Sequence, residues 1–342
     1  MADPDSTGPL SGALRRHLRD IASLALEHPP NGASLLLYDT GSPLSRLLAS
    51  AYREALPSIA ALDAGAASKD EAFAALGRLS PGDLVVLVQS VRFPFAEHRF
   101  RVELFDRGLK VVEHPHLGKV AEEEIPAYVD SLAYDPAYYR PLGAALKERI
   151  DAAQNIRLTG EGFELLYTGG FEPAKLNVGD YRGQKHVGGQ FPIGEVFTEP
   201  RELRRVSGTV RLFAFGDRDF TVRAPATPIL LEIEEGQIAA APGAPPDFVA
   251  VLDAIRAEEE RVWIRELGLG LNRGLRRDRR VGDIGAYERM CGVHISLGAK
   301  HALFAKEGFV KRRTRFHVDV FPAVDRVEID GERVFEDGAY RA

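Results

Sequence analysis

The sequence predicts two domains: an α/β domain with a small parallel sheet over residues 1–150, and a mostly antiparallel, β-rich (α+β) domain over residues 151–342. Three observations lead to this prediction. A length of 342 residues corresponds to about two domains of ordinary size. Before residue 150, short apolar runs alternate with amphipathic segments, which is typical of a parallel sheet with packed helices. After residue 150, short alternating runs are separated by Gly, Asp and Pro, which is typical of antiparallel strands.

The elements of the first domain follow from spacing and from turn residues. Apolar residues at helical spacing predict a helix over residues 13–26. Ser42 and Pro43 suit the N-cap and the first position of the helix that follows. The remaining predicted elements are a strand over 34–38, a helix over 44–55, a strand over 83–88, a helix over 97–107 and a strand over 109–113.

The second domain is predicted to consist of short alternating strands interrupted by one helix. One helix is predicted over residues 246–267. A hairpin turn is predicted at residues 329–332, where Asp and Gly lie between two alternating runs. Strands are predicted over 156–159, 164–167, 208–213, 229–233, 293–297, 314–321 and 326–329.

Composition excludes several classes of protein. With 45% hydrophobic and 27% charged residues, the chain has the profile of a globular protein, not of a disordered one. A formal net charge of −6 argues against a nucleic-acid partner. The single cysteine excludes an internal disulfide framework and a Cys-rich zinc site. The sequence has no secretory signal and no long apolar run, so we expect a cytoplasmic protein without a membrane partner.

The segment Phe316-His317-Val318-Asp319-Val320 carries the first chemical signal. Apolar residues at alternate positions predict a strand with one face in the core. His317 and Asp319 then share the other face, where an imidazole and a carboxylate suit a divalent metal. Taken alone, the pair is more often an ordinary His–Asp pair on a solvent face.

His294 lies on a second predicted strand with the same alternation. If this strand pairs with residues 314–321, His294 faces His317 and Asp319. Two histidines and one carboxylate form the set found at mononuclear iron sites. A single strand histidine, however, is more often structural than a ligand.

Two glutamates stand in apolar, glycine-rich surroundings. Glu195 follows Gly194 and precedes Val196 and Phe197, which predicts a partly buried carboxylate that needs a partner such as a metal. Glu266 lies in a similar stretch, where a salt bridge to a neighbouring arginine is the simpler interpretation.

Four motifs together resemble the thermophilic metalloaminopeptidases, the leucyl aminopeptidases of the aminopeptidase T and aminopeptidase S type. They are GEVFTEP at 194–200, RELGLGLN at 265–272, GVHISLG at 292–298 and FHVDVF at 316–321. The resemblance covers residues 130–342 well and the first domain loosely. It implies a C-terminal metal-binding domain, a peptide or other small-molecule substrate and a homodimer.

The resemblance also implies a ligand set for two divalent metal ions, with Zn, Co and Mn as candidates. The matching residues are Glu195, Glu266, His294, His317 and Asp319. The family has a tyrosine seven residues after its first histidine, whereas this chain has His301 there. His301 is therefore a candidate ligand, acid–base group or pocket residue.

The family has relatives with different chemistry. The 2,5-dihydroxypyridine dioxygenases resemble these peptidases and use one Fe(II), whose ligands match His294, His317 and Asp319. Retention of Glu195 and Glu266 favours the peptidase, because a facial triad does not require them. A third hypothesis is a metal-stabilised binding protein without enzymatic activity.

The favoured hypothesis is an aminopeptidase in which two cations activate a water that attacks a peptide carbonyl. Glu266 is the candidate for proton transfer, and His301 is a second one. Glu199 is a candidate contact for the substrate α-amine. In the alternative hypothesis, one Fe(II) supports ring cleavage of a dihydroxypyridine- or catechol-like substrate.

Overall fold

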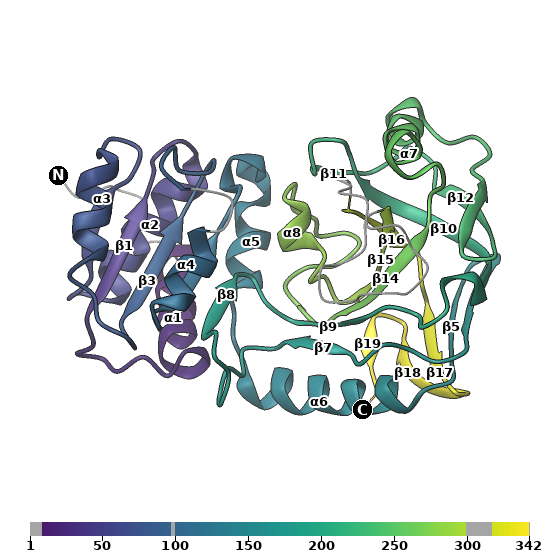
Figure 1. Ribbon diagram of the computed structural model, residues 1–342, viewed down its shortest axis with the longest axis horizontal. Helices are drawn as coiled ribbons and strands as arrows, with labels where there is room; N and C mark the ends of the chain where they lie inside the picture. The colour runs from purple at the N-terminus through teal and green to yellow at the C-terminus, as the bar shows by residue number, and fades with distance from the viewer. Residues whose placement is uncertain (1–8, 97–99, 299–316, 342) are drawn as a thin grey trace. The chain divides into compact units, whose positions relative to one another are not determined.

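The computed structural model describes residues 9–96, 100–298 and 317–341, and the chain forms two compact units (Figure 1). The first unit comprises Met1–Arg140, Val178–Ile193 and Arg279–Ala286, and the second comprises Pro141–Asn177, Gly194–Asp278 and Tyr287–Ala342. The chain thus passes between the units several times, whereas a single boundary was expected near residue 150. That position lies inside helix α6 (Pro136–Ala152).

The first unit contains a five-stranded parallel sheet in the order β2-β1-β3-β4-β8. Its strands are β1 (Ser34–Tyr38), β2 (Ala60–Asp63), β3 (Leu84–Val88), β4 (Lys110–His114) and β8 (Gly188–Gln190). The central strand β3 is buried throughout. A strand covered on both faces needs apolar residues at every position, which explains its unbroken run of Leu and Val.

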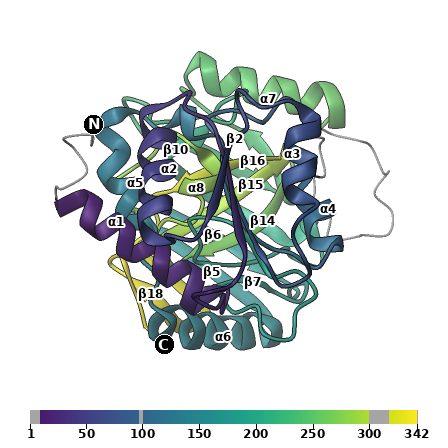
Figure 2. The same ribbon diagram turned by 90° about the vertical axis from the view of Figure 1, so that its left-hand side faces the viewer.

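Helices cover both faces of this parallel sheet. Helices α1, α2 and α5 lie on one side of it, and α3 and α4 lie on the other (Figure 2). Their bounds are α1 (Pro9–Asp20), continued by a π-helical turn (Ile21–Ala25), α2 (Pro43–Ala55), α3 (Lys69–Leu76), α4 (Phe100–Asp106) and α5 (Ile125–Ser131). The small parallel sheet expected from the sequence is confirmed, although β2, α3 and β8 were not predicted.

A buried histidine ends strand β4. The ring of His114 lies between two tyrosine hydroxyls, with Nε2 2.7 Å from Tyr52 Oη and Nδ1 3.1 Å from Tyr128 Oη. Burial lowers the pKa of His114 to about 3. The imidazole is therefore neutral at physiological pH, and its two nitrogens are satisfied by hydrogen bonds rather than by a charge.

In its described residues, the second unit is built on a large, mostly antiparallel sheet of fourteen strands. Its main path runs β19-β18-β17-β5-β6-β10-β16-β15-β14-β9-β7. The bounds are β5 (Asn155–Gly160), β6 (Phe163–Thr168), β7 (Lys175–Asn177), β9 (Glu195–Thr198), β10 (Val206–Gly216), β11 (Val222–Arg223), β12 (Ile229–Glu234), β13 (Gln237–Ala240), β14 (Ile264–Gly270), β15 (Gly292–Gly298), β16 (His317–Pro322), β17 (Arg326–Ile329), β18 (Glu332–Glu336) and β19 (Ala339–Tyr340). The antiparallel character expected of this half is confirmed.

The helix predicted over residues 246–267 is too long. Helix α7 (Pro246–Glu259) ends where Glu260 takes a left-handed conformation with φ 66°. Residues from Ile264 onward form β14, which pairs with β9 and β15. This correction matters because it moves Glu266 from the end of a helix to the middle of a buried strand.

Other local predictions hold. The turn at residues 329–332 joins β17 and β18, with Asp330 and Gly331 both at positive φ, as the favoured two-residue hairpin turn requires. Helix α2 begins at the predicted Ser42 and Pro43, and the Ser42 hydroxyl accepts a hydrogen bond from Ser45 N. Among the described residues, no helix is both long and apolar enough to cross a membrane.

Candidate metal centre

Four neighbouring strands of the large sheet carry five of the candidate residues. Glu195 lies on β9, Glu266 on β14, His294 on β15, and His317 and Asp319 on β16. These strands are adjacent in the order β16-β15-β14-β9. Segments that are far apart in sequence therefore present their side chains to one region of the sheet.

The register of the strands places these side chains on one face. Glu195 is opposite Gly270, and His294 is opposite Gly268. Directly opposed residues of a sheet share a face, as do residues two apart on one strand. By the same rule, Asp319 is opposite Ser296, two residues from His294.

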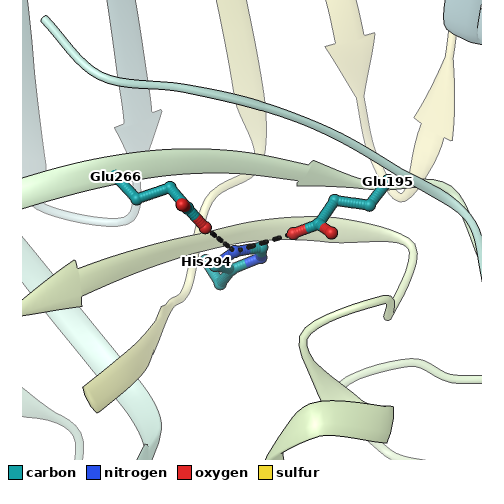
Figure 3. Close-up of side chains that lie close together, drawn as sticks. All are labelled: Glu195, Glu266 and His294. Atoms are coloured by element: carbon teal, nitrogen blue, oxygen red, sulfur yellow. Dashed lines mark hydrogen bonds and ion pairs between the residues drawn. The ribbon is translucent and has the colours of Figure 1, made fainter. Parts of the chain in front are cut away.

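The core of the site is a buried cluster of two carboxylates and one imidazole (Figure 3). His294 Nε2 lies 3.2 Å from Glu195 Oε1 and 3.5 Å from Glu266 Oε1. Ser296 Oγ accepts a hydrogen bond from Glu266 N at 3.0 Å, which fixes the backbone at this glutamate. Oxygen and nitrogen donors of these three residues lie close enough together to hold one cation.

The electrostatics of the cluster depend on the two glutamates. Burial alone lowers the pKa of His294, but hydrogen bonds with Glu195 and Glu266, helped by the negative charges of Glu195 and Asp319, raise it to about 10. In the cation-free protein the imidazole is therefore protonated at neutral pH, and it serves as the positive partner of the carboxylates. A metal ion would replace that proton.

Gly268 makes this arrangement sterically possible. A Cβ atom on Gly268 would lie 1.9 Å from Cε1 and 2.2 Å from Nε2 of His294. The imidazole thus lies directly over strand β14, in space that any other residue would fill. One glycine of the RELGLGLN segment, Gly268, is thus needed to make room for the His294 ring.

Glu288 is a further ligand candidate, which the sequence analysis missed. Donor atoms of Glu288, His294 and Asp319 also lie within 4.8 Å of one another. Two groups of candidate ligands therefore share His294. In the sequence Glu288 stands directly before Arg289, so it looks like half of an ordinary charge pair and gives no signal of the kind that Glu195 gives.

His317 lies at the margin of the site. Its Nε2 is 3.6 Å from Asp319 Oδ1, and 30% of its side chain is exposed, against 4% for that of Asp319. Among the described residues, His294 belongs to both groups with metal-ligand spacing and Asp319 belongs to one of them, whereas His317 belongs to neither. His301 lies outside the described residues.

Glu199 is fully buried but stands apart from the ligand groups. It follows the end of β9, and its backbone oxygen accepts a hydrogen bond from Glu172 N at 2.8 Å. Neither group with metal-ligand spacing in the described part of the chain includes it. Its proposed contact with a substrate amine stays a prediction.

Unsatisfied polar atoms test whether a cation fits the site. Within the described residues, Glu266 Oε2, Asp319 Oδ1 and His294 Nδ1 are buried and make no hydrogen bond. Burying a carboxylate oxygen that accepts no hydrogen bond is costly, and coordination to a cation removes that cost. The donor set, oxygen-rich with one imidazole, fits a divalent ion.

Comparisons with known proteins bear on the fold. No protein-family model matches the sequence, and no curated protein matches it. The structure is similar to that of 2,5-dihydroxypyridine dioxygenase from Pseudomonas putida KT2440, with a TM-score of 0.62 and 16% identity over 96% of this chain and 97% of that one. It is also similar to wild-type AmpT from Thermus thermophilus, an aminopeptidase, with a TM-score of 0.55 and 16% identity over 97% of this chain and all of that one.

These two structures represent both groups of enzymes that the sequence motifs resemble, so the resemblance is confirmed at the level of the fold. At 16% identity the comparison does not reach the level of substrate or reaction. The chemistry has to be argued from the residues of the site.

Proposed function

We propose that this protein is a metal-dependent hydrolase that removes N-terminal residues from peptides. The observation that carries the proposal is the pair of buried glutamates, Glu195 and Glu266, on either side of His294. An iron facial triad needs one carboxylate, whereas hydrolytic metal centres use several to hold cations and to bridge them. The similarity to AmpT shows that this fold occurs in an aminopeptidase, and the similarity to the dioxygenase shows that it occurs in the second candidate class too, so the choice rests on the two glutamates.

Glu195, Glu266 and His294 would hold one cation, and Glu288 and Asp319 extend the site toward a second. A divalent cation bound here supplies a water of lowered pKa and polarises the carbonyl of the substrate. Four of these five side chains are buried, so the surrounding strands exclude bulk solvent from them. Low exposure strengthens every charge interaction within the site.

Glu266 is the proposed proton acceptor. Its Oε1 faces His294, while its Oε2 makes no hydrogen bond among the described residues. A carboxylate with one oxygen held and the other available can take a proton from water and return it to the leaving amine. The hydrogen bond from Glu266 N to Ser296 holds the backbone at this residue in place.

Hydrolysis of leucine amide and leucine p-nitroanilide tests the proposal. Protein stripped with a chelator should be inactive, and activity should return with Zn²⁺, Co²⁺ or Mn²⁺. Glu266→Gln should lower kcat about 100-fold or more, because general base catalysis of this kind contributes that much. The matched control is Glu232→Gln, which alters an exposed carboxylate on β12. Absence of hydrolysis with all three cations would refute the proposal.

A ring-cleaving dioxygenase is the second candidate. Strands β15 and β16 are paired, so His294, His317 and Asp319 lie on adjacent strands. The dioxygenase structure has a similar fold. In this function these three residues would hold one Fe(II), which would supply the oxygen chemistry. Oxygen uptake on 2,5-dihydroxypyridine by Fe(II)-loaded protein, without hydrolysis of leucine amide, would favour this candidate over the hydrolase.

A further inference from the structure

Arg289 brings a permanent positive charge into the candidate metal centre. Its side chain is 8% exposed, and Nη1 lies 3.3 Å from Glu195 Oε2 and forms a second ion pair with Glu288. Glu195 belongs to one group of candidate ligands and Glu288 to the other. One guanidinium thus contacts a carboxylate from each group.

The backbone of Arg289 is fixed by its neighbours. Asn272 N donates a hydrogen bond to Arg289 O at 2.8 Å. Gly270 on β14 packs so closely that a Cβ there would lie 2.8 Å from Arg289 O and 2.0 Å from Met290 O. The arginine therefore enters the site from an anchored segment, and its charge cannot move far away.

The contacts of Arg289 Nη1 with Glu195 and Glu288 are ion pairs. In the described part of the chain, the buried Nε and Nη1 make no hydrogen bond. At these two atoms the guanidinium therefore acts on the carboxylates through its charge. A fixed positive charge beside two carboxylates attracts them and repels any further cation that approaches the same oxygens.

We propose that Arg289 takes the place of a second divalent cation, so that the centre binds one ion tightly and a second only weakly. The proposal rests on the metal-dependent function proposed above. Glu195, Glu266 and His294 would hold the first ion, whereas a second ion held by the group with Glu288 would come close to the guanidinium, which contacts Glu288. The number of ions that the centre binds tightly is then determined by one arginine and not by the fold alone.

Titration of metal-free protein with MnCl₂ tests this, with unbound Mn²⁺ counted by electron paramagnetic resonance. The wild-type chain should bind one ion tightly. Arg289→Gln should bind the second ion at least 10-fold more tightly than wild type, because the repulsion is removed while Glu195 and Glu288 stay. Arg289→Lys keeps the charge and should behave as wild type. Arg277→Gln is the matched control, since Arg277 pairs with Asp325 on the exterior.

The outcomes separate this inference from the proposed function. A wild-type chain that binds no Mn²⁺, Zn²⁺ or Co²⁺ refutes the metal-dependent function itself. Equal binding of two ions by wild type and Arg289→Gln, or weaker binding by the variant, overturns the role of Arg289. If Arg289→Lys matches Arg289→Gln, the shape of the guanidinium matters and the charge argument is wrong.

A second measurement keeps the test decisive if Arg289→Gln does not fold without metal. The variant is then refolded with one equivalent of MnCl₂, and only the second ion is titrated, with wild type treated in the same way. A second ion bound at least 10-fold more tightly than in wild type supports the role of Arg289. A second ion bound no more tightly than in wild type would contradict the proposal.

Discussion

Replacing Gly268 by alanine is the most direct steric perturbation of the site. The added Cβ would lie 1.9 Å from Cε1 of His294, about 1.5 Å closer than an ordinary van der Waals contact. The imidazole has to move by about that amount, because the added Cβ would occupy the space of the buried ring. Such a shift breaks its 3.2 Å contact with Glu195.

The expected cost combines two effects. Overpacking of a core costs about 1–3 kcal/mol. Loss of a charge-assisted hydrogen bond costs about 1.5–3 kcal/mol. We therefore expect Gly268→Ala to lower the free energy of unfolding by about 3 kcal/mol and to weaken Mn²⁺ binding about 100-fold, since a displaced ligand no longer reaches the ion.

Urea unfolding and Mn²⁺ titration measure both effects. The control is Gly189→Ala on β8, where an added Cβ meets no atom within 4 Å and the backbone conformation suits any residue. This control should stay within about 1 kcal/mol of wild type. Wild-type stability together with wild-type Mn²⁺ affinity in Gly268→Ala would refute the placement of the His294 ring over β14.

Two further predictions concern stability. Adding Mn²⁺ at about 100 times its Kd to chelator-stripped protein should raise the free energy of unfolding by about 2.7 kcal/mol, which a rise in Tm by calorimetry would detect; an unchanged Tm would contradict tight binding. His114 has a folded pKa of about 3 against an ordinary value of 6.5, so the unfolded chain binds the proton first as the pH falls. Its contribution is complete above pH 6.5, and stability should drop by about 2 kcal/mol between pH 6.5 and pH 5, as urea unfolding would report. His114→Gln should flatten that drop, and an unchanged pH profile in this variant would be evidence against the neutral, buried imidazole.

The strands of the candidate site could be predicted because their side chains alternate. In β15 and β16, apolar residues at every second position predict the strand and the face that lies in the apolar core. The structure buries the opposite face as well, at every residue of β15 and at all residues of β16 except His317. His294 comes close to Asp319 only if β15 pairs with β16. The sequence analysis had to assume this pairing, and the structure shows it.

Long-range pairing limits what the sequence predicts. Residues 264–267 continue the apolar pattern of α7, and only their pairing with β9 and β15 makes them a strand. Strand β8 has just three residues, two of them glycine, and it joins the parallel sheet through β4. Such short or ambiguous segments take their structure from their neighbours.

Glu288 and Arg289 illustrate the same limit at the site. Both stand in a turn between α8 (Ile284–Tyr287) and β15, where no periodicity assigns them a face. Their adjacent opposite charges resemble an ordinary surface pair. The close packing of Gly270 against this turn brings them to the ligands, and no local pattern encodes that contact.

Metal content tests the central claim most directly. Protein purified without chelator and without added metal, analysed by inductively coupled plasma mass spectrometry, should carry at least one divalent ion per chain. His294→Ala should lose that ion, because His294 belongs to both groups of candidate ligands. A wild-type chain that stays metal-free after incubation with Zn²⁺, Co²⁺, Mn²⁺ and Fe²⁺, or a His294→Ala chain with undiminished metal, would contradict the account.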